Sequence, residues 1–127
     1  MSPAAGRRAV VIEDDDDLRD MISTVLERTG LSVVTAPNGL DGLAAVRATH
    51  PVVITVDLKM PGISGLETIT RIRDISDALI VVLSAMTAQN DEDESLQAGA
   101  DVFILKPFHT RQLQERVDQR LRDLDHE

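Results

Sequence analysis

Five short apolar runs alternate with five stretches of helical periodicity, and this alternation restricts the possible folds more than any other feature of the chain. The runs carry no charged residue, as expected of strands that are buried on both faces. They are Ala9–Ile12, Leu31–Ala36, Val52–Val56, Ala78–Leu83 and Val102–Leu105. Between and after them, apolar residues recur at the three-and-four spacing of amphipathic helices. These helical stretches cover Leu18–Leu26, Leu40–Val46, Leu66–Ile75, Glu94–Ala98 and Leu113–Leu124.

Alternating strands and helices predict a parallel sheet with helices on both faces. Right-handed crossovers leave few topologies, and we expect a doubly wound, flavodoxin-like α/β fold with five strands in the order 2-1-3-4-5 and five helices. Asp16 or Asp17 is placed to cap the first helix, and Gly30 to end it. With 127 residues the chain has the size of one domain. We expect residues 1–127 to form that domain, with residues 1–7 as a flexible N-terminal tail.

Composition and charge exclude several classes of function. The chain has no cysteine, which excludes disulfides, thiolate metal sites and a cysteine nucleophile. No apolar run approaches the roughly 20 residues of a membrane span, and no signal-peptide pattern begins the chain, so we expect a soluble cytoplasmic protein. A net charge of −9 argues against direct binding of nucleic acid and favours cations and basic partners.

Polar side chains follow four of the five apolar runs. Glu13 and Asp14 come after the first run, Asp57 after the third, Ser84 after the fourth and Lys106 after the fifth. Ligands of open parallel sheets bind outside the carboxyl ends of the strands. In the order 2-1-3-4-5 these four strands are neighbours, so we expect the five side chains to meet in one cleft.

The chemistry of this set is consistent with magnesium-dependent phosphoryl transfer. Carboxylates that lie close together must take up protons or hold a cation, and Mg²⁺ prefers one or two carboxylates together with water and phosphate oxygens. With a metal present, Asp57 can stay ionised and attack phosphorus as a nucleophile. The ammonium of Lys106 and the hydroxyl of Ser84 can then pair with oxygens of the transferred group.

Each residue also has an ordinary explanation when it is considered alone. The acidic run Glu13–Asp17 can be a solvated face or a helix cap, and a single Asp57, Ser84 or Lys106 is most often a surface residue. Asp57 follows an apolar run and has no evident local partner. The acidic run, Asp57, Ser84 and Lys106 occur together at predicted ends of the strands, and this joint occurrence favours a functional site over unrelated surface residues. We interpret His50, His109 and His126 as surface residues, and Phe103 and Phe108 as packing residues.

Several motifs resemble the receiver domain of two-component response regulators, in order and spacing, over residues 8–124. The resemblance lies in the first strand with its acidic loop, in the phosphoacceptor segment and helix start, in the hydroxyl position and in the fifth strand with its lysine. The matching stretches are Val10–Arg19, Val56–Gly62 with Gly65-Leu66, Val82–Ala85, Gly99–Asp101 and Phe103–Phe108.

The resemblance implies that a sensor histidine kinase or histidine phosphotransfer protein phosphorylates Asp57. It implies Mg²⁺, or Mn²⁺, held by Glu13 or Asp14, by Asp57 and by the backbone carbonyl of Lys59. Ser84 and Lys106 would move to the phosphoryl group, Phe103 would rotate inward, and the Lys106–Pro107 bond would be cis. The surface of the fourth helix, fifth strand and fifth helix would then control an output domain or protein, or pair with a second copy of the chain.

Some residues depart from the commoner pattern of that family. Ser84 replaces threonine but keeps the hydroxyl, and Glu13 replaces aspartate with a longer side chain. Phe103 lacks the phenolic hydroxyl of the commoner tyrosine. Lys59 and Met86 occupy the positions that tune the lifetime of the phosphoryl group in the family.

Two other functions remain open from the residues alone. A small phosphohydrolase with an aspartyl nucleophile uses a similar set of groups, although 127 residues leave no cap domain. A receiver-like module that never meets phosphate is the other alternative, but neither the aspartate nor the lysine is missing here. We therefore expect a regulatory domain rather than an enzyme, one that catalyses only its own phosphorylation and slow dephosphorylation.

Overall fold

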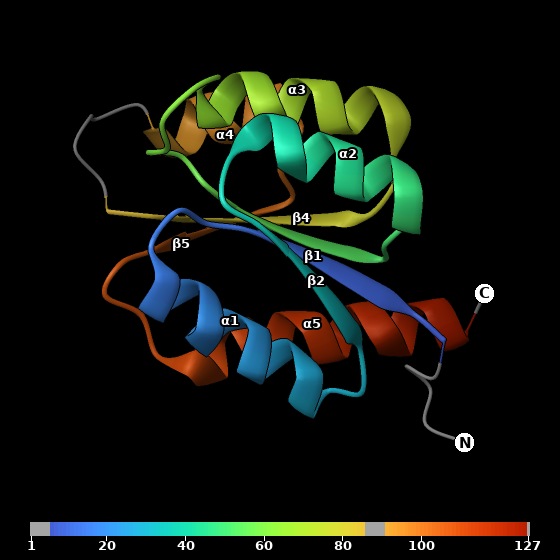
Figure 1. Ribbon diagram of the computed structural model, residues 1–127. Helices are drawn as coiled ribbons and strands as arrows, with labels where there is room; N and C mark the ends of the chain where they lie inside the picture. Colours follow the sequence, from blue (N-terminus) through green and yellow to red (C-terminus); the bar gives the residue numbers. More distant parts are fainter. Residues whose placement is uncertain (1–5, 86–90, 127) are drawn as a thin grey trace.

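The computed structural model describes residues 6–85 and 91–126. Its strands are β1 (Arg8–Ile12), β2 (Ser32–Ala36), β3 (Val53–Asp57), β4 (Leu79–Ser84) and β5 (Val102–Leu105). Its helices are α1 (Asp16–Arg28), α2 (Gly39–Thr49), α3 (Gly65–Ile75), α4 (Asp91–Ala98) and α5 (Thr110–Asp125). All five strands are parallel and stand in the order β2-β1-β3-β4-β5, which confirms the predicted topology (Figure 1).

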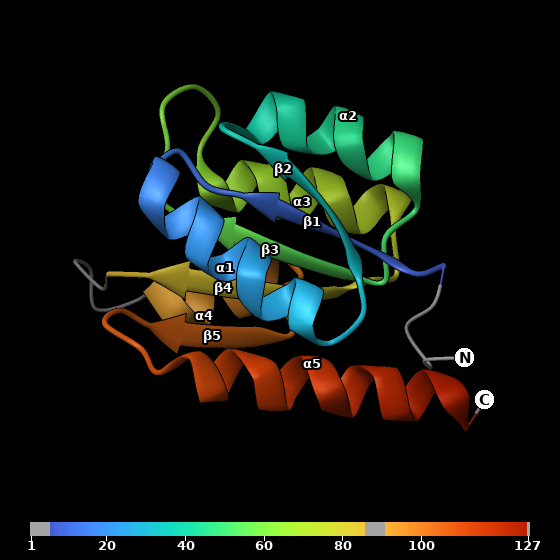
Figure 2. The same cartoon turned by 60° about the horizontal axis from the view of Figure 1, so that its bottom comes forward.

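Two hydrophobic cores lie on opposite faces of the sheet, because successive side chains of a strand point to opposite sides. In β1, Ala9 and Val11 belong to the core under α1 and α5, whereas Val10 and Ile12 belong to the core under α2 and α3. Figure 2 shows α1 and α5 together on one face. The central strand β3 is buried along its whole length, including its two polar residues Thr55 and Asp57.

The strand boundaries lie within one residue of the sequence-based expectation, whereas α1, α2, α4 and α5 extend two or three residues beyond it at one or both ends. Asp57 and Ser84 are the last residues of β3 and β4 rather than the first residues after them. The fourth helix begins earlier than predicted, at Asp91. Its first turn consists of four acids, and negative charge is favourable at a helix N-terminus. The polar stretch from Thr87 to Asn90 lies outside the described residues.

The predicted cap of α1 is wrong by one residue. Asp15, not Asp16 or Asp17, is the N-cap, and its side chain accepts a hydrogen bond of 2.8 Å from the backbone N–H of Leu18. The φ of Asp15 is −78° and its ψ is 121°, the extended conformation that an N-cap requires. Gly30 follows the helix with φ at +97°, as the predicted stop requires.

The two ends of the described chain are tied together at the edge of the sheet opposite the carboxyl ends of the strands. Arg7 forms an ion pair of 3.1 Å with Asp125 at the end of α5, and its carbonyl accepts from the backbone N–H of Ser32. Arg7 is therefore anchored, although we expected it in a flexible tail. Residues 1–5 of that tail lie outside the described part. Within the described residues, no helix is both long and apolar enough to cross a membrane.

Candidate functional site

The carboxyl ends of β1, β3, β4 and β5 bring the predicted site residues to one edge of the sheet. Ile12 pairs with Val56, and the next residues along these two strands are Glu13 and Asp57. Ser84, the last residue of β4, accepts a backbone hydrogen bond of 2.8 Å from the N–H of Lys106. The parallel register therefore aligns the strand ends, as the sequence predicts.

Three acidic side chains form the centre of the site. Glu13, Asp14 and Asp57 each offer an oxygen, and these atoms lie within 4.8 Å of one another. Glu13 is 1% exposed and Asp57 7% exposed, whereas Asp14 is open to solvent. Oxygen ligands grouped in this way suit Mg²⁺, which dehydrates reluctantly and keeps several of its waters. The donor set thus fits a divalent cation at the solvent side of the edge.

Lys106 supplies a positive charge to the two buried acids. Its Nζ lies 3.3 Å from Glu13 Oε1 and 3.5 Å from Asp57 Oδ2. One ammonium cannot neutralise two carboxylates, and burial, hydrogen bonding with Asp57 and the charge of Asp57 together raise the pKa of Glu13 to about 7. Lys106 and the N–H of Asp15 act in the opposite direction. The pair holds excess negative charge that a proton or a cation can offset.

Asp57 has a local hydrogen-bond partner, which corrects the expectation that it has none. The backbone N–H of Lys59 donates 3.0 Å to Asp57 Oδ1, so the turn after β3 orients the carboxylate. Gly65 makes this turn possible, because a Cβ on it would lie 2.5 Å from the Cα of Leu58. With Oδ1 bound to Lys59 and Oδ2 near Lys106, the Asp57 carboxylate is held in a defined orientation.

The remaining predicted residues are placed less tightly around the acids. Ser84 is fully buried, and its hydroxyl donates 3.3 Å to the carbonyl of Ala85. Phe103 is half-buried and packs against the core under α2 and α3. Phe108 packs against the other core, and the Lys106–Pro107 bond is cis, as expected. Met86 lies outside the described residues.

Arg19 is a neighbour of the site that the sequence-based interpretation missed. Its Nη1 donates 3.0 Å to the carbonyl of Glu13, and its Nη2 pairs with Asp16. One arginine thus fixes the acidic loop against the first turn of α1. The available signal was the single basic residue six positions after Glu13, but many exposed helices carry such an arginine.

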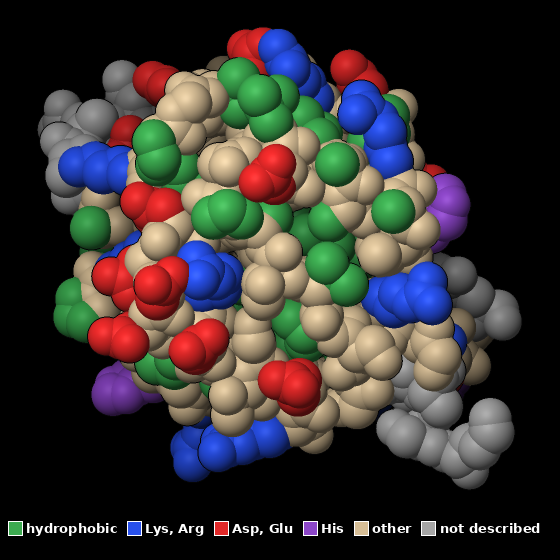
Figure 3. All heavy atoms as spheres, viewed as in Figure 1, with side chains coloured by type: hydrophobic (Ala, Val, Ile, Leu, Met, Phe, Trp, Pro, Cys, Tyr) green, Lys and Arg blue, Asp and Glu red, His purple; other side chains and the backbone are tan. Residues whose placement is uncertain are grey.

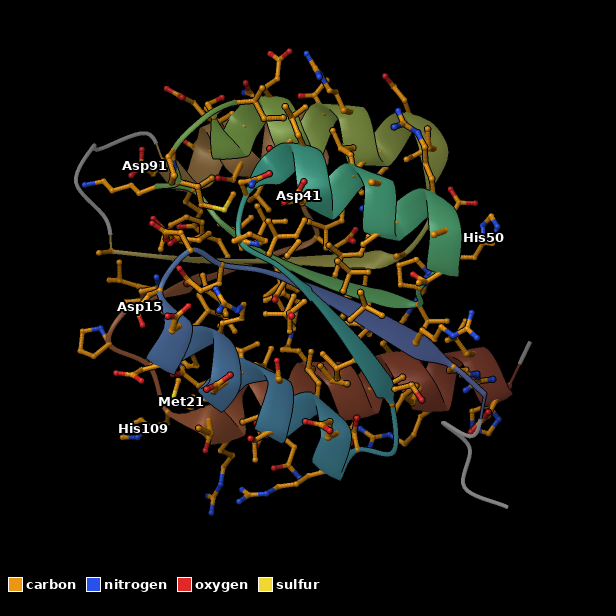
Figure 4. All side chains as sticks on the ribbon, in the orientation of Figure 1. Asp15, Met21, Asp41, His50, Asp91 and His109 are labelled. Carbon is orange, nitrogen blue, oxygen red and sulfur yellow. The ribbon has the colours of Figure 1, made fainter. Side chains whose placement is uncertain are left out.

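The surroundings of the site are strongly acidic. Figure 4 shows Asp15, Asp91 and His109 at the end of the molecule that carries the strand ends, and His50 at the opposite end. Figure 3 shows acidic side chains gathered over the start of α1, where Asp14 to Asp17 are exposed. His109 is the N-cap of α5 and His126 its C-cap, and both are exposed, as is His50 at the end of α2. None of the three lies within the acidic group.

An acidic trio, a lysine and a buried hydroxyl at the carboxyl edge of a 2-1-3-4-5 sheet define the class of signalling domain that the sequence motifs resemble. The family profile described as the response regulator receiver domain matches residues 9–118. The chain belongs to this family.

Similar proteins support the same assignment. The transcriptional regulatory protein CseB of Streptomyces avermitilis is 39% identical over 91% of this chain and 49% of its own length. The DNA-binding response regulator MtrA of Mycobacterium tuberculosis is 36% identical over 95% of this chain and 53% of its own. The chain therefore spans about half the length of these curated relatives.

Solved structures share the fold. A CheY-like receiver domain protein from Methanospirillum hungatei superposes with a TM-score of 0.87 at 25% identity, covering 94% of this chain and 97% of that one. The chemotaxis protein CheY4 of Vibrio cholerae gives 0.81 at 27% identity, covering 89% and 97%. The BeF3-activated N-terminal receiver domain of RstA from Klebsiella pneumoniae gives 0.83 at 26% identity, covering 91% and 99%.

Proposed function

We propose that this receiver domain is a phosphoacceptor switch that takes a phosphoryl group on Asp57 from a histidine kinase or a histidine phosphotransfer protein. One observation carries the proposal: Lys106 lies within 3.5 Å of the Asp57 carboxylate, at the point where Glu13, Asp14 and Asp57 converge. The arrangement combines a nucleophile, a cation site and a group that can pair with an incoming phosphoryl oxygen.

The described residues have separate roles in this reaction. Glu13, Asp14, Asp57 and the carbonyl of Lys59 would hold Mg²⁺ or Mn²⁺, which neutralises charge on the phosphoryl oxygens when it is bound. Asp57 Oδ2 attacks phosphorus, the bond from phosphorus to the donor nitrogen breaks, and the donor histidine keeps the electron pair. Lys106 moves from the carboxylates to a phosphoryl oxygen, and Ser84 exchanges its contact with Ala85 for another phosphoryl oxygen.

The output surface in this proposal consists of α4, β5 and α5. A groove of about 400 Å³ runs along these elements, with Leu96, Phe103 and Arg116 among its lining residues. Leu96 is 41% exposed and Leu105 45% exposed, so this face offers apolar area to a partner. Phosphorylation would bias the surface toward a form that binds an output domain or protein.

A second copy of the chain is a further partner that the charges of this surface favour. The first turn of α4 carries four acids, whereas α5 presents the exposed arginines Arg111 and Arg116. A two-fold interface uses the same patch on both copies, so it can place each α4 against the α5 of the partner copy. Light scattering with and without beryllofluoride, a phosphoryl mimic, measures this association.

The central test is phosphorylation by acetyl phosphate with Mg²⁺, followed by mass spectrometry of the intact protein. We expect one hydroxylamine-sensitive phosphoryl group on the wild type, none after chelation of the metal and none on the Asp57→Asn variant. Asp74→Asn, an exposed acid of α3, is the matched control and should be labelled normally. Labelling of Asp57→Asn would contradict the proposal. Repeated turnover of a phosphomonoester would instead favour the phosphohydrolase.

A further inference from the structure

Arg73, in the last turn of α3, joins three segments at the edge of the sheet opposite Asp57. Its guanidinium donates to the carbonyl of Gly99 from Nε at 3.0 Å and from Nη2 at 2.8 Å. Nη1 donates to the carbonyls of Ser76 and Ala78, each at 3.0 Å. Nη2 also pairs with Asp101 Oδ2 at 2.9 Å. All of these acceptors belong to the end of α3, the entry to β4 or the turn between α4 and β5.

Asp101 extends this connection into the sheet. Its Oδ2 also accepts 2.9 Å from the backbone N–H of Ile80, and its own N–H donates 2.9 Å to the carbonyl of the same residue. The entries to β4 and β5 are therefore bound to each other and to Arg73. Hydrogen bonds that involve a charged group are about twice as strong as neutral ones.

Gly99 allows the close approach of Arg73. Its φ is +126°, a conformation that side chains disfavour, and a Cβ would lie 3.0 Å from the Cβ of Arg73. The turn after α4 is thus shaped around the arginine rather than merely covered by it.

Helix α4 is exposed over most of its length: residues 92–94 are exposed, and Ala98 near its end packs against the core under α2 and α3. Of its eight residues only Ser95 is buried, and the hydroxyl of Ser95 bonds within the helix, to the carbonyl of Asp91. Leu96, its largest apolar side chain, is exposed. Burial of a leucine-sized side chain is worth about 1.5–3 kcal/mol, and α4 lacks such an anchor.

Helix α4 therefore has an exposed beginning and an end that leads into the turn bound by Arg73. The strands are parallel, so α4 runs from the edge with Asp57 and Ser84 to the edge with Arg73 (Figure 1). We propose that Arg73 is a positioning residue that makes the α4–β5 turn a fixed pivot, so that a change at the phosphorylation site displaces the beginning of α4 around its end. This proposal rests on the phosphoacceptor function argued above.

The test compares Arg73→Lys with Arg71→Lys in the whole chain by NMR hydrogen exchange. Lysine keeps the charge but cannot reproduce the guanidinium fork. Arg71 is an exposed arginine of the same helix, and among the described residues it pairs only with Glu67. Without phosphate, we expect amides of residues 99–102 to exchange about tenfold faster in Arg73→Lys, as for the loss of a charge-assisted hydrogen bond, and to be unchanged in Arg71→Lys.

The second arm measures amide chemical shifts before and after addition of beryllofluoride and Mg²⁺. In the wild type, changes in this region should be confined to residues 91–98; in Arg73→Lys they should extend into 99–102, while labelling of Asp57 persists. Equal changes across 91–102 in the wild type, or a uniform rise of exchange throughout Arg73→Lys, would overturn the pivot. Should Arg73→Lys not fold, Arg73→Gln, which likewise loses the guanidinium fork on the carbonyl of Gly99, is measured by the same criteria. If the wild type takes no phosphoryl group, the proposed function fails, whereas the exchange arm still decides whether Arg73 pins the turn.

Discussion

The ammonium of Lys106 lies 3.3 Å from the carboxylate of Glu13, although 93 positions separate the two residues in the chain. Strands β3 and β4 stand between β1 and β5 in the sheet, so the lysine reaches across the edge to the acids. Among the described residues, Lys106 is the cation that forms ion pairs with both buried carboxylates, Glu13 and Asp57. Lys106 therefore has two roles: it pairs with the carboxylates in the metal-free protein, and in the proposed phosphorylated form it pairs with a phosphoryl oxygen.

Replacement of Lys106 by methionine should separate these two roles. Loss of the ammonium leaves two buried carboxylates without their cation, and we expect the metal-free protein to lose roughly 1–3 kcal/mol of stability. Mg²⁺ should bind several-fold more tightly, because a neighbouring positive charge is gone. Urea denaturation in chelator and calorimetric titration of Mg²⁺ measure both effects. Arg47→Met removes an exposed positive charge in the last turn of α2, away from the site, and is the control. Weaker Mg²⁺ binding by Lys106→Met would contradict the assignment.

The raised pKa of Glu13 predicts a pH-dependent stability of the metal-free protein. Its pKa of about 7 in the folded chain exceeds the ordinary value of 4.5, so folding favours the protonated acid. The stabilisation is complete below the ordinary pKa and is lost as the pH rises through about 7, at a cost of roughly 1–3 kcal/mol. Glu13→Gln should lack this loss, and Mg²⁺ should reduce it in the wild type. Denaturation at several pH values between about 5 and 8 measures how the free energy of unfolding depends on pH. An equal pH dependence in the wild type and Glu13→Gln would refute the prediction.

The topology and the grouping of site residues could be predicted because both depend on strand order. Apolar runs identify the strands, and Glu13, Asp57, Ser84 and Lys106 follow from the rule that parallel strands end at one edge. The position of the α1 cap could not be predicted, since four consecutive aspartates are chemically equal and only the backbone conformation of Asp15 distinguishes it.

Other features depend on contacts that leave no local pattern in the sequence. Arg73 resembles any polar helix residue until the carbonyl of Gly99, 26 positions away, is brought to it. Periodicity also fails to show where an apolar stripe ends, and so Met21 and Leu40 are exposed at 37% and 57% although they belong to predicted helical stripes.

Thr55 offers a test of the core below the site. Its side chain is 1% exposed, and among the described residues its hydroxyl has no hydrogen-bond partner. A buried hydroxyl without a partner costs about 1–3 kcal/mol, so Thr55→Val, which keeps the shape, should stabilise the chain by about 1 kcal/mol. Urea denaturation measures the change, and Thr35→Val, on an exposed position of β2, should shift stability by less than about 0.5 kcal/mol. Destabilisation by Thr55→Val would mean that a buried water satisfies the hydroxyl.

Gly65→Ala should disturb the phosphoacceptor segment directly. The added Cβ would lie 2.5 Å from the Cα of Leu58 and 3.0 Å from the carbonyl of Asp57, and backbone atoms cannot turn aside as a flexible side chain can. We expect α3 to move away from the segment, with a loss of about 1–3 kcal/mol and slower labelling of Asp57 by acetyl phosphate. Gly62→Ala is the comparison: its φ of +90° makes alanine strained, at about 1–2 kcal/mol, but its Cβ meets nothing within 4 Å. The two variants should thus lose similar stability, while only Gly65→Ala slows labelling. Normal labelling of Gly65→Ala would show that the contact of α3 with Leu58 does not position the carboxylate of Asp57.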